Sequence, residues 1–135
     1  MSRDGSYNVL MATGLAGSGV EPEPVVSVTI PGGTVSKDGA SVIIRGVGIK
    51  APSMPDNGWR IDRADGELYT TGGGSDVEDV VLEIVRTGPT EAALFSSAGV
   101  PSLGESLDWS QDLVLTVSAK AGVQVAHLEV RVSPQ

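Results

Sequence analysis

The chain has 135 residues, 40% of them hydrophobic, a formal net charge of −8 and no cysteine. This length is typical of one domain with a single hydrophobic core. The lack of cysteine excludes disulfides, thiolate metal sites and cysteine nucleophiles. Residues 1–6 do not begin a secretory signal, and no apolar run approaches the roughly 20 residues that span a bilayer. We therefore expect synthesis in a cytoplasm without a signal peptide, and no membrane partner.

The acidic residues are unevenly distributed along the chain. Residues 56–112 contain 12 Asp or Glu and 3 Arg, a net charge of −9, whereas the remainder has a net charge of +1. Binding to a phosphate backbone requires clustered Lys and Arg, so we expect no nucleic-acid partner. The distribution predicts that one side or end of the fold is acidic.

Residues 1–24 are rich in Gly, Ser and Ala and end in Glu-Pro-Glu-Pro. Proline after Glu favours extended backbone, so these residues are predicted to form an extended N-terminal arm in front of a domain over residues 25–135. The arm has one apolar patch, which we expect to contact a neighbouring subunit, although folding back on its own body is about equally favourable. The patch consists of Tyr7, Val9, Leu10 and Met11.

From residue 25 the apolar residues recur with the period of a β-strand. Val26, Val28 and Ile30 share one face of a first strand. Residues 40–45 form a second strand that is apolar almost throughout, which indicates a central position in a sheet. At the carboxyl end, residues 113–119 and 125–132 alternate in the same way and are predicted to form a hairpin that closes the domain.

Residues 57–69 read Asn-Gly-Trp-Arg-Ile-Asp-Arg-Ala-Asp-Gly-Glu-Leu-Tyr. They predict a strand, a tight turn at Asp65-Gly66 and a return strand, with Trp59 and Ile61 on a common face that packs in the core. The Gly-Trp-Arg-Ile-Asp strand, Asp-Gly turn and acidic, aromatic return strand resemble a hairpin that recurs in tail-tip and tail-fibre proteins of bacteriophages. The resemblance covers about a tenth of the chain, and it implies a β-domain of a virion.

Residues 75–88 fit two structures. A helix at about 76–87 would have Ser75 as its cap and Glu78 in a capping box. A strand agrees better with the alternation and the β-branched residues, and we favour it. Residues 90–99 are expected to form a short helical turn, and residues 100–112 a long loop that carries Trp109.

The number of short strands, with 18 Gly and 8 Pro between and within them, predicts an all-β fold. The expected architecture is an antiparallel β-sandwich of the immunoglobulin-like or jelly-roll-like kind. If residues 76–87 are helical, the fold is α+β instead.

Three motifs have weak chemical interpretations. Residues 46–51 formally satisfy a dinucleotide fingerprint and follow a strand, but Pro52 and Pro55 prevent the helix that would hold a pyrophosphate, so these glycines are assigned to a strand end. Residues 72–75, Gly-Gly-Gly-Ser, lack the Lys of a phosphate loop. His127 is the only histidine, and its strand places it on a solvated face with no nucleophile elbow. No catalytic residue and no cofactor is assigned.

Two features suggest binding. Trp109 lies among Ser, Asp and Gln residues, which favours exposure and contact with a protein partner or a glycan. A group of carboxylates would surround a calcium ion if two loops met, but the EF-hand order is missing and no metal site is assigned. This group consists of Asp62, Asp65, Glu67, Asp76, Glu78 and Asp79.

The hypothesis that follows from the sequence is a non-enzymatic virion structural protein of a tailed phage or related particle. It would decorate the capsid or form part of the tail, and its arm would hold it to other virion proteins and to copies of itself. The alternative hypothesis is a carbohydrate-binding or adhesion β-sandwich module, with or without calcium.

Overall fold

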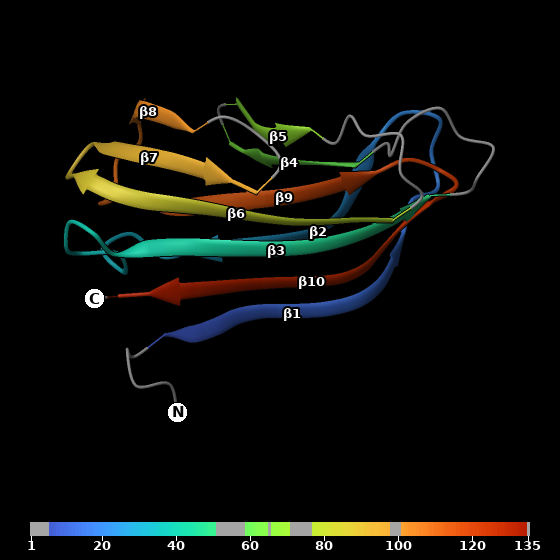
Figure 1. The fold of residues 1–135 in the computed structure, drawn as a ribbon, viewed down its shortest axis with the longest axis horizontal. Helices are drawn as coiled ribbons and strands as arrows, with labels where there is room; N and C mark the ends of the chain where they lie inside the picture. Colours follow the sequence, from blue (N-terminus) through green and yellow to red (C-terminus); the bar gives the residue numbers. More distant parts are fainter. Residues whose placement is uncertain (1–5, 51–58, 65, 71–76, 98–100, 135) are drawn as a thin grey trace.

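In the computed structural model, which describes residues 6–50, 59–64, 66–70, 77–97 and 101–134, the chain folds into two antiparallel sheets (Figure 1). The six-stranded sheet contains, in spatial order, β1 (Tyr7–Ala16), β10 (Val123–Ser133), β3 (Ser41–Lys50), β6 (Val77–Gly88), β7 (Glu91–Ser96) and β8 (Ser102–Ser106). The four-stranded sheet contains β2 (Glu23–Ile30), β9 (Leu113–Ala119), β4 (Trp59–Arg63) and β5 (Gly66–Thr70). No helix occurs in these ranges, and so none that is long and apolar enough to cross a membrane.

This architecture confirms the all-β sandwich and decides between the two structures open for residues 75–88. Val77–Gly88 is strand β6, paired with β3 and β7, and the helix alternative is wrong. Val80, Leu82 and Ile84 are buried while the residues between them face outward, which is the period of a strand. The β-branched content therefore outweighed the helix-capping pattern.

The predicted hairpin of residues 57–69 is present. β4 pairs with β5 in antiparallel register, with Arg63 opposite Gly66, and β9 lies on the other side of β4. Trp59 and Ile61 are both buried in the core, as expected. Asp65, which was assigned to the turn, lies outside the described residues.

The predicted hairpin at the carboxyl end is wrong. The two strands are present as β9 and β10, but β9 belongs to the four-stranded sheet and β10 to the six-stranded sheet. The turn between them crosses from one sheet to the other. Alternation within each strand defines a buried face but not the partner strand, so the pattern alone does not separate a hairpin from a crossover.

The prediction of a helical turn over residues 90–99 is also wrong for the part of this segment that the structure describes. Glu91–Ser96 is strand β7, which pairs with β6, and β8 follows inside the predicted loop. Both strands are short and lie toward one edge of the sheet, where local sequence signals are weak.

The predicted N-terminal arm is not separate from the body. Tyr7–Ala16 is β1, the end strand of the six-stranded sheet, and it pairs with β10 along its length. Val9, Leu10 and Leu15 pack against the core of the same chain. The apolar patch was recognised correctly, but the alternative in which it folds back on its own body is the one observed.

The core lies between the sheets and contains both tryptophans. The indole of Trp59 packs on β3 at Gly46 and Gly48, where a Cβ atom would approach it to within 2.8 and 2.3 Å. The two glycines of the dinucleotide fingerprint therefore make room for an aromatic ring. They were assigned to a strand end, but they lie inside strand β3, which continues to Lys50.

Candidate functional site

The two outward faces of the sandwich differ in chemistry. On the four-stranded sheet, the exposed positions include Ser27 and Thr29 of β2, and Ser27 lies 3.5 Å from Thr116 of β9 (Oγ to Oγ1). This face is polar. The outward face of the six-stranded sheet instead carries large apolar side chains on its central strands, and we refer to it as the outer face.

The apolar residues of the outer face come from three neighbouring strands. The cross-strand register puts Ile49 opposite Val77 and Ile43 opposite Glu83, which in turn lies opposite Phe95. Four of the apolar side chains are between 38% and 58% exposed, and no described segment covers them. The apolar set is Ile43, Val47, Ile49, Val77, Val81 and Phe95.

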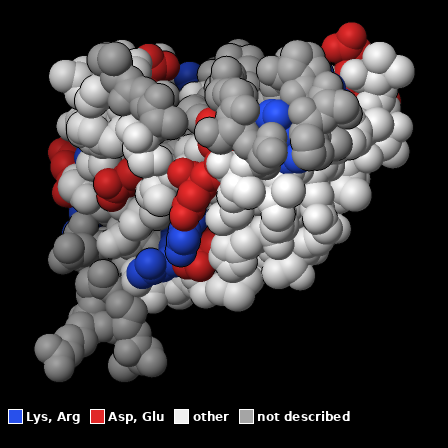
Figure 2. Space-filling model, turned by 45° about the vertical axis from the view of Figure 1, so that its right-hand side comes forward, with Lys and Arg blue, Asp and Glu red and all other residues white. Residues whose placement is uncertain are grey.

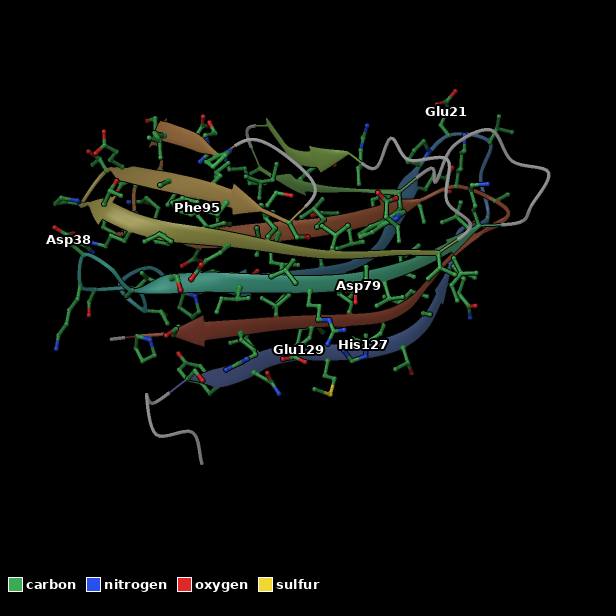
Figure 3. All side chains as sticks on the ribbon, viewed as in Figure 1. Glu21, Asp38, Asp79, Phe95, His127 and Glu129 are labelled. Atoms are coloured by element: carbon green, nitrogen blue, oxygen red, sulfur yellow. The ribbon has the colours of Figure 1, made fainter. Side chains whose placement is uncertain are left out.

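Charged side chains cross the middle of this face. Arg45 of β3 forms a two-pronged ion pair with Asp79 of β6, at 2.9 and 3.2 Å, and lies directly opposite Glu129 of β10. Glu129 is 3.7 Å from both His127 and Arg131. Asp79, His127 and Glu129 are labelled in Figure 3. In Figure 2, basic side chains (blue) and acidic side chains (red) lie close together, with uncharged residues (white) beside them. The charges largely balance each other, so the face as a whole is not strongly acidic.

The ion pair influences both of its partners. The hydrogen bonds from Arg45 lower the pKa of Asp79 below its usual range, and the same contact raises the pKa of Arg45. Both side chains are about half exposed, so solvent screens the pair and it contributes little to stability. Its geometry instead fixes two charges at defined positions on the face.

Trp109 does not lie on the surface, and the prediction that it contacts a protein partner or a glycan is wrong. It is 3% exposed, and its indole Nε1 donates a hydrogen bond of 2.9 Å to the carbonyl oxygen of Glu91. Leu107 and Trp109 point into the core, whereas Asp108 and Ser110 point outward. Asp108 accepts hydrogen bonds from the backbone and hydroxyl of Ser110, which stabilises this turn and lowers the pKa of Asp108.

The proposed calcium ligands are not gathered together where they are described. Asp62 lies in the four-stranded sheet and pairs with Arg60, whereas Asp79 lies in the other sheet and pairs with Arg45. Asp65, Asp76 and residues 72–75 lie outside the described residues. Among the described residues, no group of three or more potential ligands is close enough to hold a metal ion.

His127 lies on the outer face, as predicted, about one-third exposed and opposite Thr13 and Val47. His127 lines neither of the two hollows that are best defined in the described part of the structure. The first, of about 340 Å³, is lined by Arg63 and Asp112 among others. Arg63 donates to the carbonyl of Ser106 and Asp112 accepts from the amide of Gly32, so these groups already serve the fold.

The four residues predicted to contact other subunits are divided by the fold. Val9 and Leu10 pack against the core, whereas Tyr7 and Met11 remain 46% and 57% exposed along β1. The sequence prediction missed the apolar residues of the outer face. The available signal was that residues 42–49 and 77–85 carry apolar residues at both alternating positions. In residues 40–45 this was interpreted only as a central position in a sheet, and residues 75–88 were weighed only as helix or strand.

The strand order separates the acidic segment of the sequence from the rest of the chain within each sheet. Strands β4 to β8, from the segment with a net charge of −9, lie together on one side of both sheets. Strands β1, β10 and β3 form the other part of the six-stranded sheet, and β2 and β9 the other part of the four-stranded sheet; they come from the segments with a net charge of +1. Figure 1 shows β1 and β10 at the bottom and β8, β7, β5 and β4 at the top. The predicted acidic side is therefore the side of β7, β8 and β5.

The chain matches no protein-family model, and no curated protein matches its sequence.

Proposed function

We propose that this protein is a non-enzymatic structural subunit that joins a larger assembly through the outer face of its six-stranded sheet. The observation that carries the proposal is the row of exposed aliphatic and aromatic side chains on β3, β6 and β7. Exposed apolar groups that lie next to each other over several strands are typical of surfaces that another protein covers. The opposite face of the sandwich, with its Ser and Thr residues, serves as an internal comparison.

The assembly that we propose is the virion of a tailed phage or a related particle, in its capsid decoration or its tail. Support comes from the resemblance of residues 57–69, whose described part forms the paired strands β4 and β5, to a hairpin of tail-tip and tail-fibre proteins. The partners are other virion proteins, and neither a cofactor nor a nucleic acid takes part. The alternative of a carbohydrate-binding or adhesion module used Trp109 and the acidic loops, and it loses its aromatic contact residue because Trp109 is buried.

The proposal is tested by adding a tagged copy of the protein to the strain that carries its gene and purifying tailed particles on a density gradient. The tagged protein should band with the particles. Val81→Glu and Phe95→Glu should each reduce its amount in that band by about tenfold, because a charge would be desolvated in the contact. Thr29→Glu, on the opposite face, is the matched control and should band normally.

Two results would contradict the proposal. Absence of the wild-type protein from the particle band would exclude the virion. Equal incorporation of the Val81, Phe95 and Thr29 variants would exclude the outer face as the contact.

A further inference from the structure

β1 is an end strand whose free edge lacks two of the usual kinds of protection, charged residues and proline. Its outer edge pairs with no described strand, whereas its inner edge pairs with β10. Natural end strands are commonly protected by charged residues or proline. The other three end strands follow this rule, since β2 contains Glu23 and Pro24, β5 contains Glu67, and β8 contains Glu105. The ten residues of β1 include neither a charged residue nor proline.

The regular part of β1 is short and well defined. An extra residue interrupts its register between Asn8 and Leu10, and Gly14 adopts a left-handed conformation with φ of 65°. Between these irregularities, Leu10 to Thr13 pair without a break with Val130 to His127. Along this stretch Met11 is 57% exposed and Thr13 is also exposed.

Charge determines which molecule can approach this edge. The protein has a net charge of −8, so two copies repel each other over most of their surfaces. The segments that form the β1 side of the sandwich have a net charge of +1, and the acidic strands β4 to β8 lie on the far side. Two copies that meet edge to edge at β1 therefore keep their acidic halves as far apart as the fold allows.

We propose that β1 pairs with β1 of a second copy of this chain, in antiparallel orientation about a two-fold axis, so that the two six-stranded sheets become continuous. Directly opposite residues of an antiparallel pair point to the same side of the sheet. The two-fold axis, perpendicular to the sheet, must therefore lie midway between one residue and the same residue of the second copy. It cannot lie level with the peptide bond between two successive residues. With the axis at Met11, Met11 faces its own copy, and with the axis at Ala12, Met11 faces Thr13.

Both registers make Met11 and Thr13 the sensitive positions. The experiment is sedimentation velocity over a concentration series of the full-length protein. The wild type should form a dimer. Met11→Lys should raise the dissociation constant by about tenfold or more if the axis lies at Met11, and the double variant Met11→Lys/Thr13→Lys should do so in either register, because a Lys then lies directly opposite a Lys of the second copy. Leu103→Lys, at a 73% exposed position on β8 at the other end of the sheet, is the matched control and should dimerise as the wild type does.

The proposal is overturned if the wild type is monomeric at every concentration, or if both β1 variants dimerise like the wild type. It is also overturned if Leu103→Lys weakens the dimer as strongly as the double β1 variant does. Circular dichroism and thermal melting verify that each variant is folded. The dimer stands apart from the proposed function, since it is measured without particles.

Discussion

Trp59 and Trp109 are both buried, and each depends on a different kind of neighbour. The ring of Trp59 fits only because Gly46 and Gly48 have no side chain. The indole of Trp109 instead needs a backbone acceptor, the carbonyl of Glu91. The polar residues around Trp109 suggested exposure, yet Leu107 and Trp109 follow the alternation of a strand with one buried face. A short period-two pattern was therefore more informative than the average polarity of the segment.

Loss of the indole hydrogen bond should destabilise the protein measurably. Trp109→Phe removes the donor and leaves the carbonyl of Glu91 without this partner in a partly buried site, which should lower the free energy of unfolding by about 1 kcal/mol. Urea unfolding followed by circular dichroism measures the change. Tyr7→Phe, at an exposed aromatic, should change it by less than about 0.5 kcal/mol. Equal effects at the two positions would contradict the assigned hydrogen bond.

The Arg45–Asp79 ion pair makes a prediction about pH. The pKa of Asp79 is lowered in the folded protein, so the carboxylate stabilises the fold above its unfolded pKa, and this contribution is lost as the pH falls through the folded value. In Arg45→Gln, the pKa of Asp79 should rise toward its ordinary value because the largest stabilising contact is gone. Carboxyl chemical shifts in an NMR titration give this pKa. An unchanged value in the variant would show that Arg45 does not hold Asp79.

Strand β3 combines two functions in alternating positions. Its inward residues include Gly46 and Gly48, which accept the Trp59 ring, and its outward residues include Ile43 and Val47 on the outer face. The sequence predicts a central strand, which is confirmed, since β10 and β6 flank β3. The same apolar pattern did not show that one of the two faces is left open within the chain.

The close contact between β3 and Trp59 can be tested by a substitution that adds one methyl group to the strand. Gly48→Ala would place a Cβ atom 2.3 Å from Nε1 of Trp59, so the ring or the strand must move, at a cost of about 1–3 kcal/mol of stability. Gly66→Ala is the matched control, because a Cβ atom there meets nothing within 4 Å. Chemical denaturation of both variants measures the difference. Comparable stability of the two would refute the packing of Trp59 on β3.

The sequence predicted individual strands more reliably than their arrangement in space. Alternation identified the buried positions of β2, β9 and β10 because burial on one face is a local property of the chain. The assignment of β9 and β10 to different sheets depends on contacts between distant residues, such as Leu128 with Gly46 and Leu115 with Val28. The outer face likewise emerges only when β3, β6 and β7 are placed side by side, since its apolar residues come from three separate segments.

In the molecule as a whole, β1 closes one side of the six-stranded sheet, so removal of the N-terminal segment is not a neutral change. Deletion of residues 1–16 would remove Leu10 and Leu15 from the core and leave β10 without a partner on one edge. We expect a loss of at least about 2 kcal/mol of unfolding free energy, or insolubility. Guanidinium unfolding of the truncated protein measures it. Unchanged stability would instead support the original prediction of a detached arm.

The central claim, that the outer face is covered in an assembly, is tested most directly by site-specific labelling. The chain has no cysteine, so a label can react only with the cysteine that is introduced. One variant has it at Val81 on the outer face, and the other at Thr29 on the opposite face. Maleimide labelling rates are compared between the free protein and purified particles that contain it. We expect the rate at position 81 to fall at least about tenfold in particles while position 29 remains as reactive as in the free protein. Equal reactivity of position 81 in both states would contradict the account.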